Sequence, residues 1–338
     1  MNIKYKSYNL PFKHPFTISK GTKTHQPSLV IELEYFGIKG YGEAPAITYY
    51  NITVEKMIED LEAKRHFIEK FSFSDPERYW HYLHHLFPQN PFLVCALDMA
   101  GWDIYGRMKR KKLYELWGLN ISNNPVTDFT IGIDTTDLMI AKIKEMNWPV
   151  YKIKLGTEND IEIVTELRRH TTSVFRIDAN AAWNTEEAMN KINIFKQLNV
   201  ELIEQPLAKD DWEGMQYLFK NSPLPLIADE SCVSEYDIQK CYHHFHGINI
   251  KLTKCSGITP AKRMIEKART LDMKVMLGSM NESSIGTAAI SQLLPLADYA
   301  DIDGPLLLAE DVGERVTFDN GKIVYNSING IGVAVQPF

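Results

Sequence analysis

From about residue 126 onward, short apolar runs alternate with stretches in which apolar residues recur every three or four positions. The first pattern is typical of buried strands and the second of amphipathic helices. The apolar runs recur at intervals of roughly 25 residues, the spacing of repeated strand–helix units in a parallel sheet. The eight predicted strands are residues 129–132, 150–154, 174–178, 201–204, 226–229, 248–251, 274–277 and 299–301.

The helices between these strands, and the absence of two glycine motifs, restrict the fold classes that fit the pattern. Asn184 is predicted to cap one helix, because Glu187 follows three residues later at the start of an apolar stripe. The chain contains neither G-x-G-x-x-G nor G-x-x-x-x-G-K-[ST], so nucleotide binding through those loops is not expected. Eight strand–helix units without a phosphate loop favour a (β/α) barrel over a doubly wound sheet.

The part of the chain that precedes this pattern has mixed α+β character. Residues 2–9, 28–36 and 39–43 alternate in the manner of strands and are separated by glycine turns. Thr53 is predicted to cap a helix, and a second helix is expected over residues 92–107.

Six of the eight predicted barrel strands end in charged residues. In barrels of this type, catalytic groups sit at the C-terminal ends of the strands, which meet in one small circle. A single charged residue at a strand end could simply be exposed to solvent. Six charged strand ends at one rim of a barrel, however, must lie close together. The charged ends are Lys152 with Lys154, Asp178, Glu204, Asp229, Lys251, and Asp301 with Asp303.

Three carboxylates on successive strands, Asp178, Glu204 and Asp229, predict an all-oxygen metal site. Hard oxygen ligands suit Mg²⁺, with Mn²⁺ as a substitute, rather than Zn²⁺, which prefers His and Cys. Without a cation, three converging carboxylates would repel one another and raise one another's pKa.

Two lysines, Lys154 and Lys251, are predicted to lie on opposite sides of this site, one on each face of a bound substrate. A free lysine has a pKa of about 10.4, which must fall for the amine to act as a base near neutral pH. Lys152 shares a face of its strand with Lys154 and is expected to line the substrate site as a neighbouring positive charge that lowers the pKa of Lys154.

Composition and charge exclude several classes of protein. The chain has 338 residues, an apolar fraction of 44% and a net charge of −6, which argues against nucleic acid as a partner. No apolar run is long enough for a membrane span, and the alternating N-terminus is expected to be a strand rather than a signal peptide. Four unpaired cysteines without metal-ligand spacing favour a cytoplasmic location. A homo-oligomer is left open.

Several motifs occur in a fixed order along nearly the whole chain. They are Gly40–Pro45, Ala96–Asp103, Lys152–Lys154, Asp178–Asn180, Ile203–Pro206, Asp229–Ser231 and Asn249–Leu252. As a set they resemble the enolase superfamily and, within it, the muconate-lactonizing subgroup, although no single motif is specific.

The resemblance implies a (β/α)7β modified TIM barrel with an α+β capping domain. The expected division is a capping domain at residues 1–122, a barrel at 123–308 and a tail at 309–338 that returns to the capping domain. In this superfamily a Lys or His base acts on a substrate whose enediolate is stabilised by Mg²⁺. By resemblance, the Mg²⁺ ligands are Asp178, Glu204 and Asp229, and the bases are Lys154 and Lys251.

The eighth strand separates the reactions within the subgroup. Asp301-Ile302-Asp303 resembles the D-x-D of dipeptide epimerases, in which it holds the α-ammonium of the substrate. The leading hypothesis is therefore a dipeptide epimerase. An o-succinylbenzoate synthase or cycloisomerase of the same subgroup is the alternative, although its substrate has no ammonium group. A non-catalytic, metal-binding barrel is a third reading, which the paired lysines disfavour.

The expected substrate is a dipeptide whose C-terminal residue is epimerised. Thr130, Ser279 and Met280 are expected to form pocket walls, and a loop over residues 19–25 is expected to cover the site. By resemblance, Lys23 falls where an arginine binds the glutamate carboxylate, which favours L-Ala-D/L-Glu, a product of murein peptide recycling. A hydrophobic C-terminal residue is the alternative.

Overall fold

A computed structural model describes residues 1–335 of the chain, and its centre is an eight-stranded parallel sheet in the order β11-β10-β9-β8-β7-β6-β5-β4. Each strand pairs in parallel with its neighbour. The eight strands predicted from the sequence are all present. They are β4 (Phe129–Ile131), β5 (Val150–Lys154), β6 (Val174–Asp178), β7 (Val200–Glu204), β8 (Leu226–Ala228), β9 (Gly247–Lys251), β10 (Lys274–Gly278) and β11 (Tyr299–Asp301).

The two edge strands of this sheet approach each other and nearly close it into a barrel. Thr127, just before β4, forms a parallel bridge with Ala300 of β11. The backbone N–H of Asp128 donates to the carbonyl oxygen of Ala300 at 3.2 Å. The C-terminal strand ends therefore meet around one opening, as predicted.

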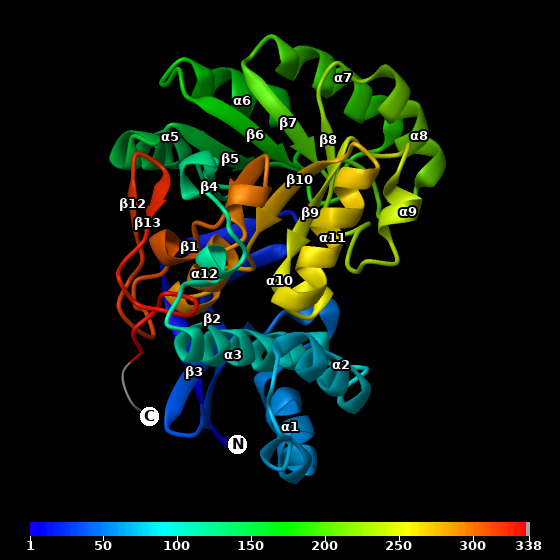
Figure 1. The fold of residues 1–338 in the computed structure, drawn as a ribbon. Helices are drawn as coiled ribbons and strands as arrows, with labels where there is room; N and C mark the ends of the chain where they lie inside the picture. Colours follow the sequence, from blue (N-terminus) through cyan, green and yellow to red (C-terminus); the bar gives the residue numbers. More distant parts are fainter. Residues whose placement is uncertain (336–338) are drawn as a thin grey trace.

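Helices cover the outside of the sheet, and Figure 1 shows α5 to α8 in an arc around it. The predicted cap is present, because the side chain of Asn184 accepts a hydrogen bond from the backbone of Glu187. The helices that follow β4 are α5 (Thr136–Met146), α6 (Asp160–Arg168), α7 (Thr185–Lys196), α8 (Trp212–Asn221), α9 (Ile238–Cys241), α10 (Leu252–Cys255), α11 (Ile258–Thr270), α12 (Ser284–Ser291), η3 (Leu294–Leu296) and α13 (Gly304–Leu307).

The N-terminal part forms a separate antiparallel sheet in the order β1-β2-β3, packed against helices (Figure 1). Gly42 permits the closest approach of sheet and helix, because a Cβ there would lie 1.9 Å from the carbonyl oxygen of Ala96. Thr53 caps α1, as predicted. The elements are β1 (Asn2–Ile18), β2 (Gly21–Tyr35), β3 (Ile38–Pro45), η1 (Thr48–Tyr50), α1 (Val54–Glu69), α2 (Pro76–Leu86), α3 (Pro91–Lys109), α4 (Leu113–Leu116) and η2 (Ile121–Asn123).

The segment 19–25, expected to be a loop, is instead the tip of a long β-hairpin. β1 continues to Ile18, which pairs with Gly21, and Phe16 pairs with Lys23. Only the two residues between the strands form the turn. The resemblance predicted a loop, but both strands continue beyond the capping sheet as a paired two-stranded ribbon.

The C-terminal tail contacts both parts of the molecule. It contains the hairpin β12 (Thr317–Asp319) and β13 (Lys322–Val324). Asp103 of α3 accepts a hydrogen bond from the backbone of Ile331, and the N–H of Thr127 donates to Gly321 at the base of the barrel.

Residues 1–335 contain three hydrophobic clusters: a large one centred on the barrel, a smaller one between the capping sheet and its helices, and a small one formed by Leu202, Ile227 and Met276. Polar contacts join the capping part and the barrel, since Asp98 of α3 accepts hydrogen bonds from the N–H and hydroxyl of Thr259 at the start of α11. Within residues 1–335, no helix has the length and apolar character that crossing a membrane requires.

Candidate active site

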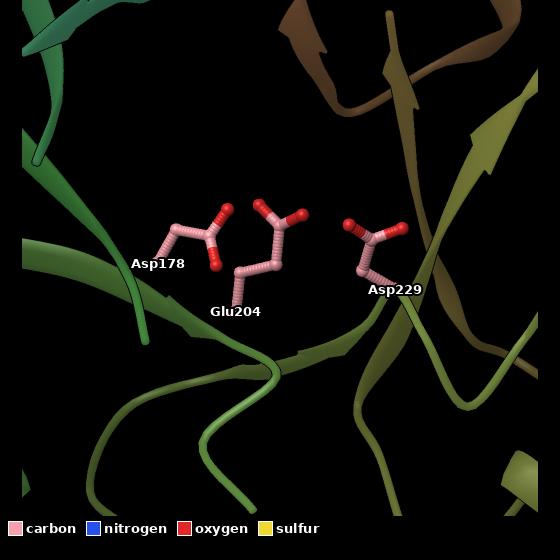
Figure 2. A group of neighbouring side chains, drawn as sticks. All are labelled: Asp178, Glu204 and Asp229. Atoms are coloured by element: carbon pink, nitrogen blue, oxygen red, sulfur yellow. The ribbon is translucent and has the colours of Figure 1, made fainter. Parts of the chain in front are cut away.

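Three carboxylates meet at the C-terminal ends of adjacent strands. Asp178 and Glu204 end β6 and β7 and are register partners, and Asp229 directly follows β8. Each offers an oxygen within 4.8 Å of the others, and all three residues are buried. Figure 2 shows the carboxyl groups side by side between these strands.

The two lysines proposed as bases contact this triad from opposite ends. Lys154 Nζ lies 2.6 Å from Asp178 Oδ2, and Lys251 Nζ lies 2.7 Å from Asp229 Oδ2. β5 and β9, which carry the lysines, flank the three strands of the triad. The ammonium groups therefore approach the site from two sides, as predicted.

Lys152 lies at the centre of the charged cluster. Its Nζ is 2.7 Å from Glu204 Oε2, 3.0 Å from Asp178 Oδ2 and 2.7 Å from Asp301 Oδ2. Burial acts to lower the pKa of Lys152, but the negative charges of Asp178, Asp301 and Glu204 outweigh burial and raise the pKa well above its ordinary value. Lys152 is thus a fixed positive charge beside Lys154.

The carboxylates respond unequally to this environment. Burial acts to raise the pKa of Asp178, but the neighbouring charges of Lys152 and Lys154 lower it. Lys251 and Lys254 hold the pKa of Asp229 well below its usual range, against the effect of burial. Burial and the charge of Asp178 raise the pKa of Glu204 to about 7. Without a cation, the lysines thus favour the ionised form of Asp178 and Asp229 but do not offset burial and repulsion at Glu204.

The donor set fits a hard divalent cation. All three converging ligands are carboxylate oxygens, the donors that Mg²⁺ prefers. Glu204 Oε2 is buried and, although close to Lys152, receives no hydrogen bond of normal geometry. A buried acceptor without a donor is costly, and a cation between the carboxylates would satisfy it.

Asp301 and Asp303 lie on the other side of Lys152. Asp301 ends β11, and Asp303 accepts a hydrogen bond at 2.6 Å from the backbone N–H of Thr130. Burial acts to raise the pKa of Asp301, but Lys152 lowers it. Burial and the charge of Asp301 raise the pKa of Asp303 to about 7. The pair forms a negative pocket separate from the metal ligands.

A cavity of about 630 Å³ connects these groups and extends beneath the tip of the β1–β2 hairpin and η1. The predicted metal ligands Asp178 and Glu204 are not part of its wall but lie next to Asp229, which is. Every other residue predicted for the site contributes to its wall. These residues are Lys23, Thr130, Lys152, Lys154, Asp229, Lys251, Ser279, Met280, Asp301 and Asp303.

The hairpin tip brings two lysines to the cavity. Lys20 forms an ion pair with Glu230 at 3.2 Å and lies over the ring of Tyr49 at 4.1 Å. Burial lowers the pKa of Lys23, and no charged group among residues 1–335 contributes to that shift. Lys23 is therefore the lysine at the tip that remains available to an anionic ligand.

Several residues of the site are not among those predicted from the sequence. Asn249 lies two positions before Lys251 on β9, so strand periodicity could have placed it on the same face. Lys254 lies in the helical turn after β9, for which strand alternation offers no signal. Tyr49 and Tyr50 of η1, together with Glu230, also line the cavity.

The fold and the site together define an enolase-type protein, a parallel barrel whose strand ends hold a carboxylate triad between two lysines. The chain belongs to the mandelate racemase/muconate lactonizing enzyme family. Residues 2–118 match the N-terminal domain of that family, and residues 136–338 match the enolase C-terminal domain-like family. The predicted superfamily is confirmed.

Known proteins of similar sequence and structure refine this placement. The chain is 51% identical to an L-Ala-D/L-amino acid epimerase of Flavobacterium johnsoniae, over 99% of this chain and 100% of that protein. A substrate-liganded L-Ala-D/L-Glu epimerase from Bacillus subtilis superposes with a TM-score of 0.92 at 26% identity, covering 100% and 99% of the two chains. A dipeptide epimerase from Enterococcus faecalis, complexed with Mg and L-Leu-L-Tyr, gives 0.90 at 27% identity, with 98% of each chain covered.

Proposed function

We propose that the protein is a Mg²⁺-dependent dipeptide epimerase, an isomerase that inverts the α-carbon of the C-terminal residue of a dipeptide. The observation that carries this function is the placement of Lys154 and Lys251 at opposite ends of the carboxylate triad, with Asp301 and Asp303 beyond Lys152. The epimerase activity of the similar proteins supports it.

Epimerisation requires removal of the α-proton on one face and its return on the other. In one direction the neutral amine of Lys154 takes the proton while the ammonium of Lys251 delivers one, and in the other direction the roles exchange. Asp178, Glu204 and Asp229 would hold the Mg²⁺, whose charge offsets the second negative charge that develops on the substrate carboxylate.

The remaining charged groups orient the dipeptide. Asp301 and Asp303 form the negative pocket in which an N-terminal ammonium would be bound. Lys152, already paired with three carboxylates, balances their charge rather than exchanging a proton with the substrate. An o-succinylbenzoate synthase substrate would leave the aspartate pocket without a cation, which disfavours that alternative.

For the side chain of the epimerised residue, we propose an acidic group and L-Ala-D/L-Glu as a substrate. Lys23 supports this choice, because it is an uncompensated cation at the cavity wall. Lysine lacks the bidentate fork of arginine, and Ile47, Tyr49 and Met280 offer apolar walls, so discrimination against apolar residues should be modest. We further propose a cytoplasmic location and a role in murein peptide recycling.

The decisive experiment is incubation of the enzyme with Mg²⁺ and L-Ala-L-Glu in D₂O. We expect deuterium at the α-carbon of the glutamate and formation of L-Ala-D-Glu, both followed by proton NMR. The absence of exchange with a panel of L-Ala-L-Xaa dipeptides would contradict the function. Exchange with apolar members alone would contradict only the acidic specificity.

A further inference from the structure

The oxygens of the carboxylate triad are divided between two kinds of partner. One oxygen of each residue faces a lysine that lines the cavity: Lys154 for Asp178, Lys152 for Glu204 and Lys251 for Asp229. The other oxygen of each is bonded to a donor that does not take part in the proposed chemistry. For Asp178 this donor is the backbone N–H of Asn180, at 2.9 Å.

For Glu204 the second donor is the side chain of Asn249. Its Nδ2 donates to Glu204 Oε1 at 2.8 Å, and the residue is fully buried on β9. The amide is confined from the other side by β10, since a Cβ at Gly278 would lie 2.5 Å from Asn249 Oδ1. The bond therefore comes from a side chain with little freedom to turn away.

For Asp229 the second donor is Lys254. Its Nζ lies 2.5 Å from Asp229 Oδ1 and 2.7 Å from the carbonyl oxygen of the same residue. The carbonyl oxygens of Cys232 and Asn249, at 3.0 and 3.1 Å, complete its surroundings. An ammonium has three protons, so all are engaged by these four acceptors. Lys254 is buried and is not part of the cavity wall, so it does not reach the substrate.

We propose that Asn249 and Lys254 are positioning residues that hold Glu204 and Asp229 with Glu204 Oε2 and Asp229 Oδ2 directed to the cation. This inference deepens the proposed function, because it rests on the Mg²⁺ site of the same reaction. Metal-ligating carboxylates are commonly held by hydrogen bonds from residues behind them, and loss of such a partner typically lowers metal affinity about 10–100-fold.

Lys254 also keeps Asp229 oriented when Lys251 no longer contacts it. In this structure the carboxylate is bonded to both Lys251 and Lys254. Lys251 must leave Asp229 Oδ2 when a cation and a substrate are bound. Lys254 is held by carbonyl oxygens of the segment after β8 and of β9. It therefore stays in place and keeps the carboxylate oriented.

The test compares Mg²⁺ affinity, measured by isothermal titration calorimetry without dipeptide, in the wild type, Lys254→Met and Asn249→Ala. We expect the dissociation constant to rise about 10–100-fold in each variant. The matched control is Lys191→Met, which removes an equally buried lysine paired with Asp160 on the outer side of the barrel. Its Mg²⁺ affinity should stay within about twofold of the wild type.

Melting temperatures of the Mg²⁺-free proteins separate positioning from folding. Variants that bind Mg²⁺ normally, whatever their stability, would overturn the proposal, and so would an equal loss of affinity in Lys191→Met. If Lys254→Met does not fold, Asn249→Ala decides the outcome. A wild type that binds Mg²⁺ but epimerises no dipeptide would refute the proposed function. The Mg²⁺ affinities of the variants would still test the positioning role of Asn249 and Lys254.

Discussion

At the scale of single residues, the site depends on how charges of opposite sign are paired. Three of the lysines that line the cavity, Lys152, Lys154 and Lys251, each contact a different carboxylate of the triad at 2.6 to 2.7 Å. The lysines lower the pKa of Asp178 and Asp229 against the effect of burial, whereas burial and the charge of Asp178 raise the pKa of Glu204 to about 7. We propose that the two lysines at the ends of the triad exchange protons with the substrate, since Lys152 is shared among three carboxylates.

The first prediction concerns these two lysines. Lys154→Ala and Lys251→Ala should each reduce epimerisation at least 10³-fold, because one face of the α-carbon loses its acid or base. Each variant should retain slow α-deuterium exchange with only one of the two stereoisomers. The measurement is NMR of L-Ala-L-Glu and L-Ala-D-Glu in D₂O. Wild-type epimerisation by either variant would exclude a two-base reaction.

A second prediction concerns Lys23 at the hairpin tip. Lys23→Ala should lower kcat/KM for L-Ala-L-Glu by about 10-fold or more, because a charge-assisted bond is lost, and should leave L-Ala-L-Leu nearly unchanged. The matched control is Lys39→Ala, which removes a partly exposed lysine that pairs with Glu32 on the capping sheet. Equal effects on both dipeptides would argue against an acidic subsite.

At the scale of helices and strands, buried hydrogen bonds connect the capping part to the barrel. α3 presents Asp98 to the first turn of α11, where it accepts two hydrogen bonds from Thr259. Trp102 of the same helix donates to the hydroxyl of Thr259 at 2.8 Å. These bonds connect residues more than 150 positions apart in the chain, and no local pattern in the sequence marks them.

The third prediction follows from the burial of Asp98, which raises its pKa to about 7. The folded state holds this proton more tightly than the unfolded chain, where the pKa is about 3.9. The stabilising contribution of the protonated group is therefore complete below about pH 4 and is lost as the pH rises to about 7.

We expect Asp98→Asn to remove this dependence. Between pH 4 and 7 the free energy of unfolding of the wild type should fall, relative to that of the variant, by an amount on the order of a few kcal/mol. Urea unfolding at a series of pH values measures the difference. Parallel curves for the two proteins would show that Asp98 titrates normally.

The domain boundaries also belong to this scale. The division at residues 122 and 308 stays a prediction, since the tail contacts both α3 and the base of the barrel. The smaller hydrophobic cluster lies within the capping part, whereas the large one joins barrel residues to residues of the capping part such as Phe12 and Trp102.

At the scale of the whole molecule, the active site is a joint product of both parts. The barrel supplies the carboxylates and lysines, and the hairpin tip and η1 of the capping part close over them. The ion pair between Lys20 and Glu230 connects the two across the cavity. Neither part alone encloses the cavity.

The fourth prediction is that the cation stabilises the entire fold. A ligand that binds only the folded state adds stability by about 2.7 kcal/mol at 100 times its dissociation constant. Mg²⁺ should therefore raise the melting temperature by several degrees, and exhaustive chelation should abolish turnover, with recovery on adding Mg²⁺ or Mn²⁺. Calorimetric scans and activity assays before and after dialysis measure both effects. Full activity after chelation would contradict a metal-dependent reaction.

The sequence by itself determined the barrel and the principal charged groups of its rim. Eight apolar runs at regular spacing favour a parallel barrel over other folds. In such a barrel the C-terminal strand ends lie at one rim, independently of the details of side-chain packing. That is why the order of residues along the chain was enough to assign Asp178, Glu204, Asp229, Lys154 and Lys251 to one site.

Only the tertiary structure decided which side chains bind the outer oxygens of the carboxylates and which segment covers the cavity. Asn249 and Lys254 act on carboxylates 45 and 25 positions away, and Lys20 on a partner 210 positions away. The extension of the β1–β2 hairpin depends on pairing between its two strands rather than on the composition of its tip. Such contacts are set by how the strands and the two parts of the chain pack, which local patterns of residues do not encode.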